Sequence, residues 1–281
     1  MVLMLITGCP EMASYAYSSG VECIFVDLEI EGKIERQGGL NTVISGHDPA
    51  SVGVVREAVP DAELLVRLNP ASERSRSEIN EAIHAGANTL MLPMFTNMDE
   101  IAYVAECIDG RARLIPLVET PAAMIRIDQI ASHPGVDEVY IGLNDMHLAM
   151  QLDFMFELLA EGLVDFMTER IRKHGKPFGF GGLATLDAGL VPGIRVLGEH
   201  ARLGSSRVIL SRDFHRSSTT IEELRTRIDL PAEVQRVRSA LQELNLRDSN
   251  EVEANRVDVI RMVREAAQAR GRARRGVEAH A

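Results

Sequence analysis

The sequence predicts a (β/α)8 barrel, that is, a TIM barrel, followed by a C-terminal helical extension. Eight short apolar runs recur between residues 2 and 211, and helix-like segments lie between them. The runs are almost continuously apolar, which is typical of parallel strands covered on both faces. The length of 281 residues suits one such barrel. No G-x-G-x-x-G motif follows an early strand, so an open doubly wound sheet that binds a dinucleotide is the weaker alternative.

The elements follow from this pattern in chain order. Strands are predicted over residues 2–7, 23–28, 63–68, 89–94, 113–118, 138–143, 177–182 and 207–211. Helices are predicted between them, for example over 76–85, 98–108 and 121–131, where Pro121 suits a first helical turn. We divide the chain into a barrel domain, residues 1–230, and a helical extension, residues 231–281. The extension is expected to hold helices over 232–244 and 251–270, the second capped by Ser249 or Asn250, and a basic end that frays.

Composition excludes several classes of function. Hydrophobic residues make up 46% of the chain, enough for a sizeable core, and a net charge of −11 argues against general nucleic-acid binding. No apolar run reaches the about 18 residues of a membrane helix, and the start, MVLMLITG, is expected to be a strand instead of a signal peptide. The three cysteines form no C-x-x-C pair, which suits a reducing compartment. We expect a cytoplasmic protein without a nucleic-acid or membrane partner.

Two carboxylates end consecutive predicted strands. Glu119 follows the fifth strand and Asp145 follows the sixth. Neighbouring strands lie roughly 4.8 Å apart, so these side chains repel each other unless one is protonated or a cation lies between them. Two carboxylates, waters and substrate oxygens suit an octahedral divalent ion such as Mg²⁺. The alternative is that each residue caps the next helix or pairs with an arginine.

Arg67 ends the third predicted strand and is expected to project into the barrel mouth. A guanidinium there suits a substrate carboxylate, which it can bind with two parallel hydrogen bonds. An ion pair with Asp27 or Glu29, at the end of the second strand, is the alternative. The two readings are compatible, because such a pair would orient the arginine.

Three residues are candidates for moving a proton. His147 lies two residues after Asp145, and His47 lies on a polar loop after the second strand. Either imidazole titrates near neutral pH, although a structural role is the commoner one for any single histidine. Lys33 is a third candidate base, and it alone among the three lysines follows a strand. A Schiff-base mechanism would depend on it, and we predict no such adduct.

Five motifs in order resemble the HpcH/HpaI aldolase and citrate lyase β-chain family of the phosphoenolpyruvate/pyruvate barrel superfamily. They are F-V-D-L-E (25–29), V-R-L-N (66–69), A-G-A…M-L-P-M (85–94), L-V-E-T-P-A-A (117–123) and I-G-L-N-D (141–145). The resemblance covers roughly residues 1–215. It implies a metal-dependent aldolase or lyase that works as a trimer-based assembly or hexamer, in which a helix over about residues 218–229 packs on a neighbour.

The resemblance also implies roles for single residues. Glu119 and Asp145 would bind Mg²⁺ or Mn²⁺, and Arg67 would bind the carboxylate or keto oxygen of pyruvate. Backbone amides near Asp145, at Asn144, would hold the pyruvate carboxylate. The implied reaction is reversible cleavage of a 4-hydroxy-2-oxo acid to pyruvate and an aldehyde.

Two departures concern the base and the substrate. Ile30 stands where pyruvate aldolases of the family carry a histidine, and Leu117 stands where many carry a glutamine. The run E-I-E-G-K-I-E-R-Q (29–37) is nearer the citrate lyase side of the family. A CoA-ester lyase and a non-catalytic metabolite-binding barrel therefore stay open as alternatives.

Overall fold

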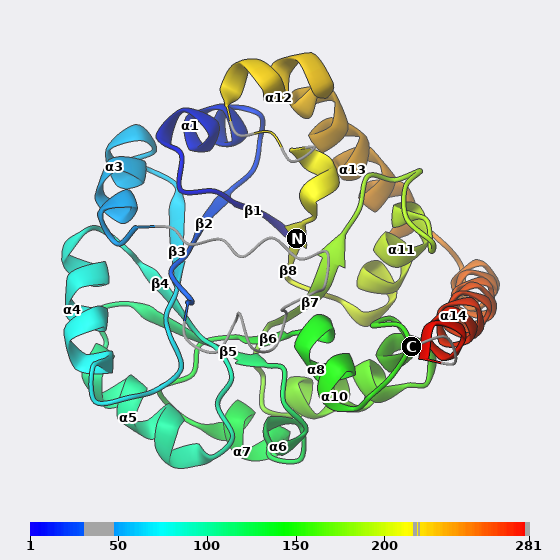
Figure 1. Cartoon of the computed structure of the whole chain (residues 1–281), viewed down its shortest axis with the longest axis horizontal. Coiled ribbons are helices and arrows are strands. Elements are labelled where there is room, and N and C mark those ends of the chain that lie inside the picture. Colours follow the sequence, from blue (N-terminus) through cyan, green and yellow to red (C-terminus); the bar gives the residue numbers. More distant parts are fainter. Residues whose placement is uncertain (31–47, 216–217, 219, 279–281) are drawn as a thin grey trace.

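Eight parallel strands close into a barrel in chain order, and the last strand pairs with the first (Figure 1). The computed structural model describes residues 1–30, 48–215, 218 and 220–278, with side chains of the last helix described through residue 273. The strands are β1 (Val2–Ile6), β2 (Cys23–Asp27), β3 (Glu63–Arg67), β4 (Thr89–Leu92), β5 (Arg113–Val118), β6 (Val139–Ile141), β7 (Phe178–Leu183) and β8 (Arg207–Leu210). The predicted TIM barrel is confirmed.

Helices surround the barrel as an outer ring (Figure 1). They are α1 (Pro10–Ser18), α3 (Ala50–Ala58), α4 (Ser75–His84), α5 (Met98–Ile108), α6 (Pro121–Met124), α7 (Ile127–Ser132), α8 (Leu143–Ala149), α9 (Glu157–Ala160), α10 (Leu163–Lys173), α11 (Gly193–Leu203), the 3-10 helix η1 (Arg212–Phe214), α12 (Ile221–Arg227), α13 (Leu230–Leu244) and α14 (Ser249–Glu278). The single helix predicted over 121–131 is instead two helices. Arg126 leaves helical geometry between them, and this turn exposes Ile125 while Ile127 and Ile130 are buried.

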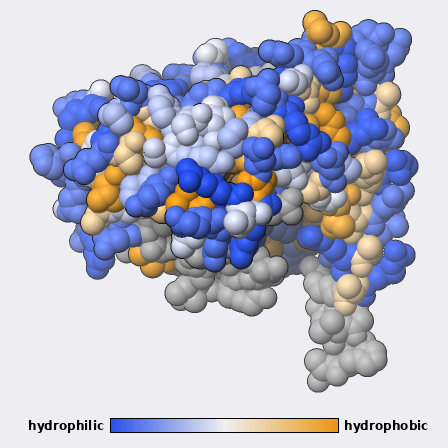
Figure 2. All heavy atoms as spheres, turned by 90° about the horizontal axis from the view of Figure 1, so that it is seen from above, coloured by the Kyte–Doolittle hydropathy of each residue, from blue (hydrophilic) through white to orange (hydrophobic). Residues whose placement is uncertain are grey.

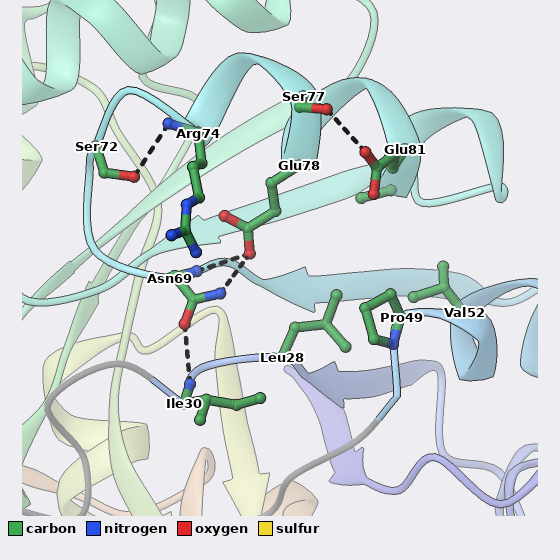
Figure 3. Close-up of a pocket in the computed structure, with 11 residues that line it drawn as sticks. Leu28, Ile30, Pro49, Val52, Asn69, Ser72, Arg74, Ser77, Glu78 and Glu81 are labelled. Atoms are coloured by element: carbon green, nitrogen blue, oxygen red, sulfur yellow. Dashed lines mark hydrogen bonds between the residues drawn. The ribbon is translucent and has the colours of Figure 1, made fainter.

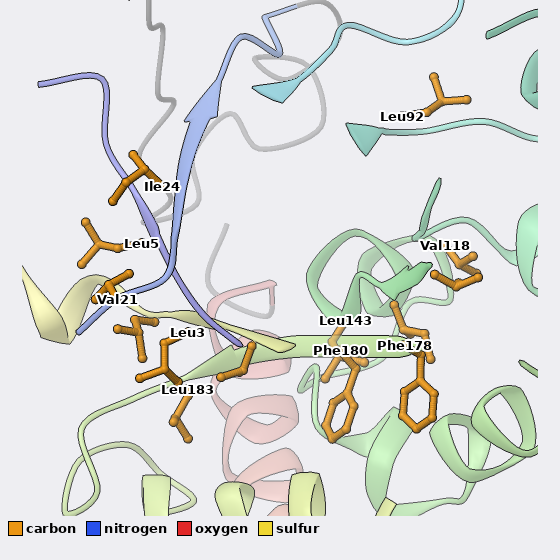
Figure 4. Packing of buried hydrophobic residues seen from close by; sticks show 14 of the residues in the cluster. Leu3, Leu5, Val21, Ile24, Leu92, Val118, Leu143, Phe178, Phe180 and Leu183 are labelled. Carbon is orange, nitrogen blue, oxygen red and sulfur yellow. The ribbon is translucent and has the colours of Figure 1, made fainter. Parts of the chain in front are cut away.

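Strand alternation divides the core into two layers. Side chains such as Leu5, Ile24 and Phe180 point outward and pack under the helices (Figure 4). Side chains such as Phe25 and Tyr140 belong to a second cluster, which fills the barrel interior. The barrel is therefore a packed core and has no pore, as is usual for this fold.

Buried charges close the amino-terminal end of the barrel. Arg207, at the start of β8, donates to Glu138 at 2.6 Å and to Glu63 at 3.1 Å. Arg113 adds a second contact to Glu138 at 3.1 Å. Arg207 and Glu138 are almost fully buried, so the pair is shielded from water. The opposite end of the barrel, where the strands end, therefore remains available for ligands.

The helices of the predicted extension pack on the barrel. In α13, Leu230, Val234 and Val237 are buried, and Arg238 donates to the Met1 carbonyl at 2.6 Å. The chain passes from α12 to α13 within a few residues, and α13 lies against α11. Residues 230–244 thus form part of the outer ring, and the domain division near residue 230 stays a prediction.

The last helix is longer than the sequence pattern predicts, because it ends at Glu278 and not near residue 270. Its cap is also different. Asp248 accepts the N–H groups of Asn250 and Glu251, while Glu251 accepts the N–H of Asp248, so these two carboxylates form a capping box that replaces the expected Ser249 or Asn250 cap.

Mostly hydrophilic side chains cover the face in Figure 2. Within the ranges described above, no helix combines the length and apolarity needed to cross a membrane.

Candidate active site

Arg67 lies at the barrel mouth in a fixed orientation. Asp27 and Arg67 are register partners on β2 and β3, and the guanidinium donates twice to the Asp27 carboxylate, at 2.8 and 2.7 Å. Glu29 lies 3.4 Å from Nε, and both carboxylates are buried. Burial alone would lower the pKa of Arg67, but the hydrogen bonds and charge of Asp27 and the charges of Glu29 and Glu119 raise it. Arg67 is therefore a permanent, oriented cation, as the ion-pair alternative predicts.

Glu119 is a buried carboxylate in an unusual electrostatic setting. It directly follows β5, is 3% exposed, and accepts the N–H of Met94 at 3.1 Å. Burial and the charges of Asp145 and Glu29 raise its pKa to about 8, although Arg67 and the Met94 N–H act to lower it. Met94 has a left-handed φ of 55°, a strained conformation that accompanies this contact. Such a carboxylate can hold a proton or face a bound cation.

A glycine makes room for Glu119. Gly142 follows β6, and a Cβ at this position would lie 2.7 Å from Glu119 Cβ and 3.0 Å from its Oε2. Real Cβ atoms essentially never come so close to another atom. The glycine of the I-G-L-N-D motif therefore lets the ends of β5 and β6 hold their polar groups side by side.

Asn144 and Asp145 occupy the first turn of α8, which begins directly after β6. Both are partly exposed, and the charge of Asp145 acts on Glu119. The first amides of a helix have no acceptor within it, so they can bind a substrate carboxylate. The structure thus brings Arg67, Glu119, Asn144 and Asp145 to one end of the barrel.

The donor set fits a hard divalent cation. Two carboxylates offer oxygen ligands, and a cation would relieve the repulsion that burial strengthens at Glu119. In the part of the chain that the structure describes, no group of three or more His, Cys, Asp and Glu side chains could hold a metal. Mg²⁺ commonly takes one or two protein carboxylates and completes its octahedron with water and substrate. Glu119 and Asp145 offer two such carboxylates.

His147 lies on a different side of α8 from Asp145. Two residues correspond to roughly 200° around a helix, so the two side chains do not face each other. His147 is 8% exposed, and its Nδ1 bonds to the Asn144 carbonyl. Burial lowers its pKa, and the positive charge of Arg270 in α14 adds to this, while the backbone contacts to Asn144 and Leu143 and the charge of Asp145 act to raise it. His47 and Lys33 lie outside the described residues.

A pocket of about 420 Å³ lies between the ends of β2 and β3 and the helices α3 and α4 (Figure 3). Asn69 joins the segments at its edge, because its backbone and side-chain N–H groups donate to Glu78 Oε1, each at 2.9 Å. Its Oδ1 accepts the N–H of Ile30 at 2.9 Å. Leu28 and Val52 give the pocket an apolar part.

These observations define a (β/α)8 barrel whose mouth combines an oriented arginine with two neighbouring carboxylates. The chain belongs to the HpcH/HpaI aldolase/citrate lyase family, whose model matches residues 3–202. The family resemblance of the sequence motifs is thereby confirmed, and the chain falls in a group of aldolase- and lyase-type enzymes. No curated protein sequence matches the chain.

Solved structures share the fold at low sequence identity. An HpcH/HpaI aldolase/citrate lyase family protein from Burkholderia cenocepacia J2315 has a TM-score of 0.61 and 16% identity, covering 86% of this chain and 94% of its own. An HpcH/HpaI aldolase from Desulfitobacterium hafniense DCB-2 has a TM-score of 0.59 and 13% identity, covering 88% and 94%. CitE from Mycobacterium tuberculosis, in complex with magnesium and pyruvate, has a TM-score of 0.59 and 15% identity, covering 92% and 97%.

Proposed function

We propose that the protein is a divalent-metal-dependent carbon–carbon lyase. It would reversibly cleave a 4-hydroxy-2-oxo acid to pyruvate and an aldehyde. The observation that carries this proposal is the buried Glu119, whose pKa is raised to about 8 beside Asp145 while Arg67 lies in the same mouth. The family membership supports it, as does the complex of the similar CitE from Mycobacterium tuberculosis with magnesium and pyruvate.

In this proposal, Glu119 and Asp145 hold the Mg²⁺ or Mn²⁺. When bound, the cation supplies Lewis-acid stabilisation of the negative charge that develops on the keto oxygen. Gly142 keeps space for the Glu119 carboxylate, and the Met94 N–H fixes its Oε1. Both contacts hold the Glu119 carboxylate in place in the metal-free protein.

Arg67 binds the oxo acid in this proposal. A guanidinium has five N–H donors, and two of them are used on Asp27. The remaining donors can reach a carboxylate or the keto oxygen, and their positive charge favours the enolate that cleavage leaves. The backbone amide of Asn144, in the first turn of α8, would donate a hydrogen bond to an oxygen of the substrate carboxylate.

The residue that takes the 4-hydroxyl proton is proposed to be a histidine. His47 and His147 are the two candidates, with Lys33 as the third. The position of His147 on the other side of α8 from Asp145 favours His47. Replacing each histidine with glutamine separates them: His47→Gln is expected to lower kcat, whereas His147→Gln leaves kcat within about threefold. The reverse result would assign the base to His147.

The test of the proposed function uses Glu119→Ala and Asp145→Ala in a pyruvate-release assay, with Mg²⁺ or Mn²⁺ and with EDTA. Each variant is expected to lose about 100-fold or more in kcat/KM, as is typical for loss of charge stabilisation. Glu106→Ala, at an exposed position on α5, is the matched control. Undiminished activity of either site variant, or indifference to EDTA, would overturn the proposal. Borohydride with pyruvate is expected to trap no adduct.

Two rival functions stay open. A CoA-ester lyase of the citrate lyase β-chain type would use the same metal site, and the family that the chain belongs to includes citrate lyase. Comparing CoA thioesters with 4-hydroxy-2-oxo acids as substrates distinguishes the two enzymes. A non-catalytic metabolite-binding barrel instead predicts silent Glu119 and Asp145 variants and loss of function when residues 231–281 are deleted. The trimer or hexamer also stays a prediction, which light scattering measures.

A further inference from the structure

The segment over residues 143–162 carries Asn144 and Asp145 and runs through α8, a turn and α9. The C-terminal helix α14 is far from this segment in sequence but lies against α9 in space. The family match ends at residue 202, so α14 lies outside it. We propose that α14 braces this segment and positions Asp145 through two positioning residues, Arg264 and Arg270. The effect on metal binding rests on the proposed function.

Two arginines of α14 make side-chain contacts with the segment. Arg264 forms a two-pronged ion pair with Glu161, with Nε to Oε1 at 2.9 Å and Nη2 to Oε2 at 3.2 Å. The guanidinium carbon of Arg270 lies 4.7 Å from the ring centroid of Phe154, a cation–π contact. Phe154 in turn packs edge-to-face on Phe156, with centroids 5.4 Å apart. These contacts hold the turn and the end of α9.

Apolar packing places α14 against the segment. Val259, Val263 and Ala267 recur every four residues, which puts them on one helix face, and all three are buried. In α9, the helix that α14 contacts, Leu158 and Leu159 are buried as well. The arginines therefore act from a helix that is already packed in place.

The other part of α14 is fixed to the barrel ring. Asn255 is 3% exposed, and its amide donates to Glu199 Oε1 at 2.9 Å and to the Arg195 carbonyl at 3.1 Å, both on α11. Gly198 permits this approach, because a Cβ there would lie 2.6 Å from Asn255 Nδ2. Since α11 is the helix that comes after β7 in the chain, α14 connects the segment over residues 143–162 to the part of the outer ring that follows β7.

The turn between α8 and α9 can transmit position to Asp145. The Leu152 N–H donates to the His147 carbonyl at 2.9 Å, which ties the turn to α8. Glu157 accepts the N–H groups of Asp153 and Phe154, at 2.9 and 2.7 Å. Metal–ligand distances tolerate about 0.2 Å, so even a small shift of α8 changes the metal site.

The test compares Arg264→Ala, Arg270→Ala, the double variant and Arg270→Lys in the full chain. Arg261→Ala is the matched control, because this exposed arginine pairs with Asp258 and Glu265 of its own helix. Two quantities are measured: hydrogen exchange of peptides covering residues 143–162, and the Mn²⁺ dissociation constant by calorimetry.

Each alanine variant is expected to speed exchange over 143–162 and to weaken Mn²⁺ binding about two- to fivefold, the double variant about tenfold. Arg270→Lys keeps a cation near the ring, so it is expected to retain most of the wild-type protection from exchange and most of the wild-type Mn²⁺ affinity. The control variant Arg261→Ala is expected to change neither quantity. Unchanged exchange over 143–162 in the double variant overturns the brace. Faster exchange with unchanged Mn²⁺ affinity overturns the effect on Asp145. If the wild type binds no Mn²⁺, the proposed metal site fails, and exchange alone decides the brace.

Discussion

Replacing Gly142 with alanine perturbs the candidate site by a single methyl group. The backbone at this position, with φ −85° and ψ 107°, is open to alanine, so the substitution brings no backbone strain. The added Cβ would lie 2.7 Å from Glu119 Cβ, which is 0.7 Å inside the 3.4 Å at which ordinary contact begins. It would also lie 3.0 Å from Glu119 Oε2. Glu119 or the end of β6 must therefore move.

The size of this shift decides the expected result. A displacement of several tenths of an ångström exceeds the about 0.2 Å that metal–ligand distances tolerate. We expect Gly142→Ala to weaken Mn²⁺ binding about tenfold or more, by analogy with the loss of groups that orient metal ligands. Overpacking is expected to cost about 1–3 kcal/mol of unfolding free energy.

Calorimetry with Mn²⁺ and urea unfolding measure the two effects. Gly53→Ala is the control, because Gly53 lies inside α3 and a Cβ there meets nothing within 4 Å. It should keep the wild-type Mn²⁺ affinity and raise the unfolding free energy by about 0.5–1 kcal/mol. Wild-type Mn²⁺ affinity in Gly142→Ala would refute the reasoning that Glu119 is a ligand held by this close packing.

Three more predictions test the arginine, the carboxylate and the closed end of the barrel. Arg67→Lys removes the paired bonds to Asp27 and is expected to raise the KM for the oxo acid about tenfold; an unchanged KM in steady-state kinetics would contradict it. In metal-free protein, folding raises the pKa of Glu119 from 4.5 to about 8, so its stabilising contribution is present below about pH 4.5 and is lost as pH rises to about 8. Urea unfolding in EDTA should show an unfolding free energy roughly 3–5 kcal/mol lower at about pH 8 than at about pH 4.5, and Glu119→Gln should reduce this dependence on pH. The same dependence of unfolding free energy on pH in the wild type and in Glu119→Gln would contradict this. Arg207→Met leaves Glu138 buried with a weaker counter-charge and is expected to cost about 3–5 kcal/mol of unfolding free energy, with kcat per folded molecule unchanged; a melting temperature equal to wild type would contradict it.

Strand positions could be predicted from the sequence because buried parallel strands are continuously apolar. Their ends were less accessible. The run over 89–94 predicts a strand to Met94, but β4 ends at Leu92, since Pro93 has no N–H for the sheet and Met94 turns left-handed to face Glu119. Similarly, β6 ends at Ile141 because Gly142 already caps α8.

The positions of the charged candidate residues at the barrel mouth could be predicted from the strand pattern alone. Arg67, Glu119 and Asp145 all lie at the mouth where the strand pattern predicts them. The backbone N–H of Met94 carries no side-chain signal, so its contact with Glu119 could only be seen in three dimensions. The direction of His147 was also hidden, because the sequence pattern does not show that a helix begins at Leu143 and turns this side chain away from Asp145.

The C-terminal helices show the limit of local patterns. The sequence predicts two helices after residue 230, and both are present. Their partners depend on contacts distant in sequence, such as Arg238 with the Met1 carbonyl and Asn255 with Glu199. No periodicity within α13 or α14 could reveal which part of the barrel each helix covers.

The most direct test of the metal site is anomalous diffraction from a crystal soaked with Mn²⁺ and pyruvate. The account predicts a manganese peak between the carboxylates of Glu119 and Asp145, with pyruvate bound to the metal and to the Arg67 guanidinium. A manganese peak elsewhere, or pyruvate bound in the mouth with no metal between these two carboxylates, would contradict it.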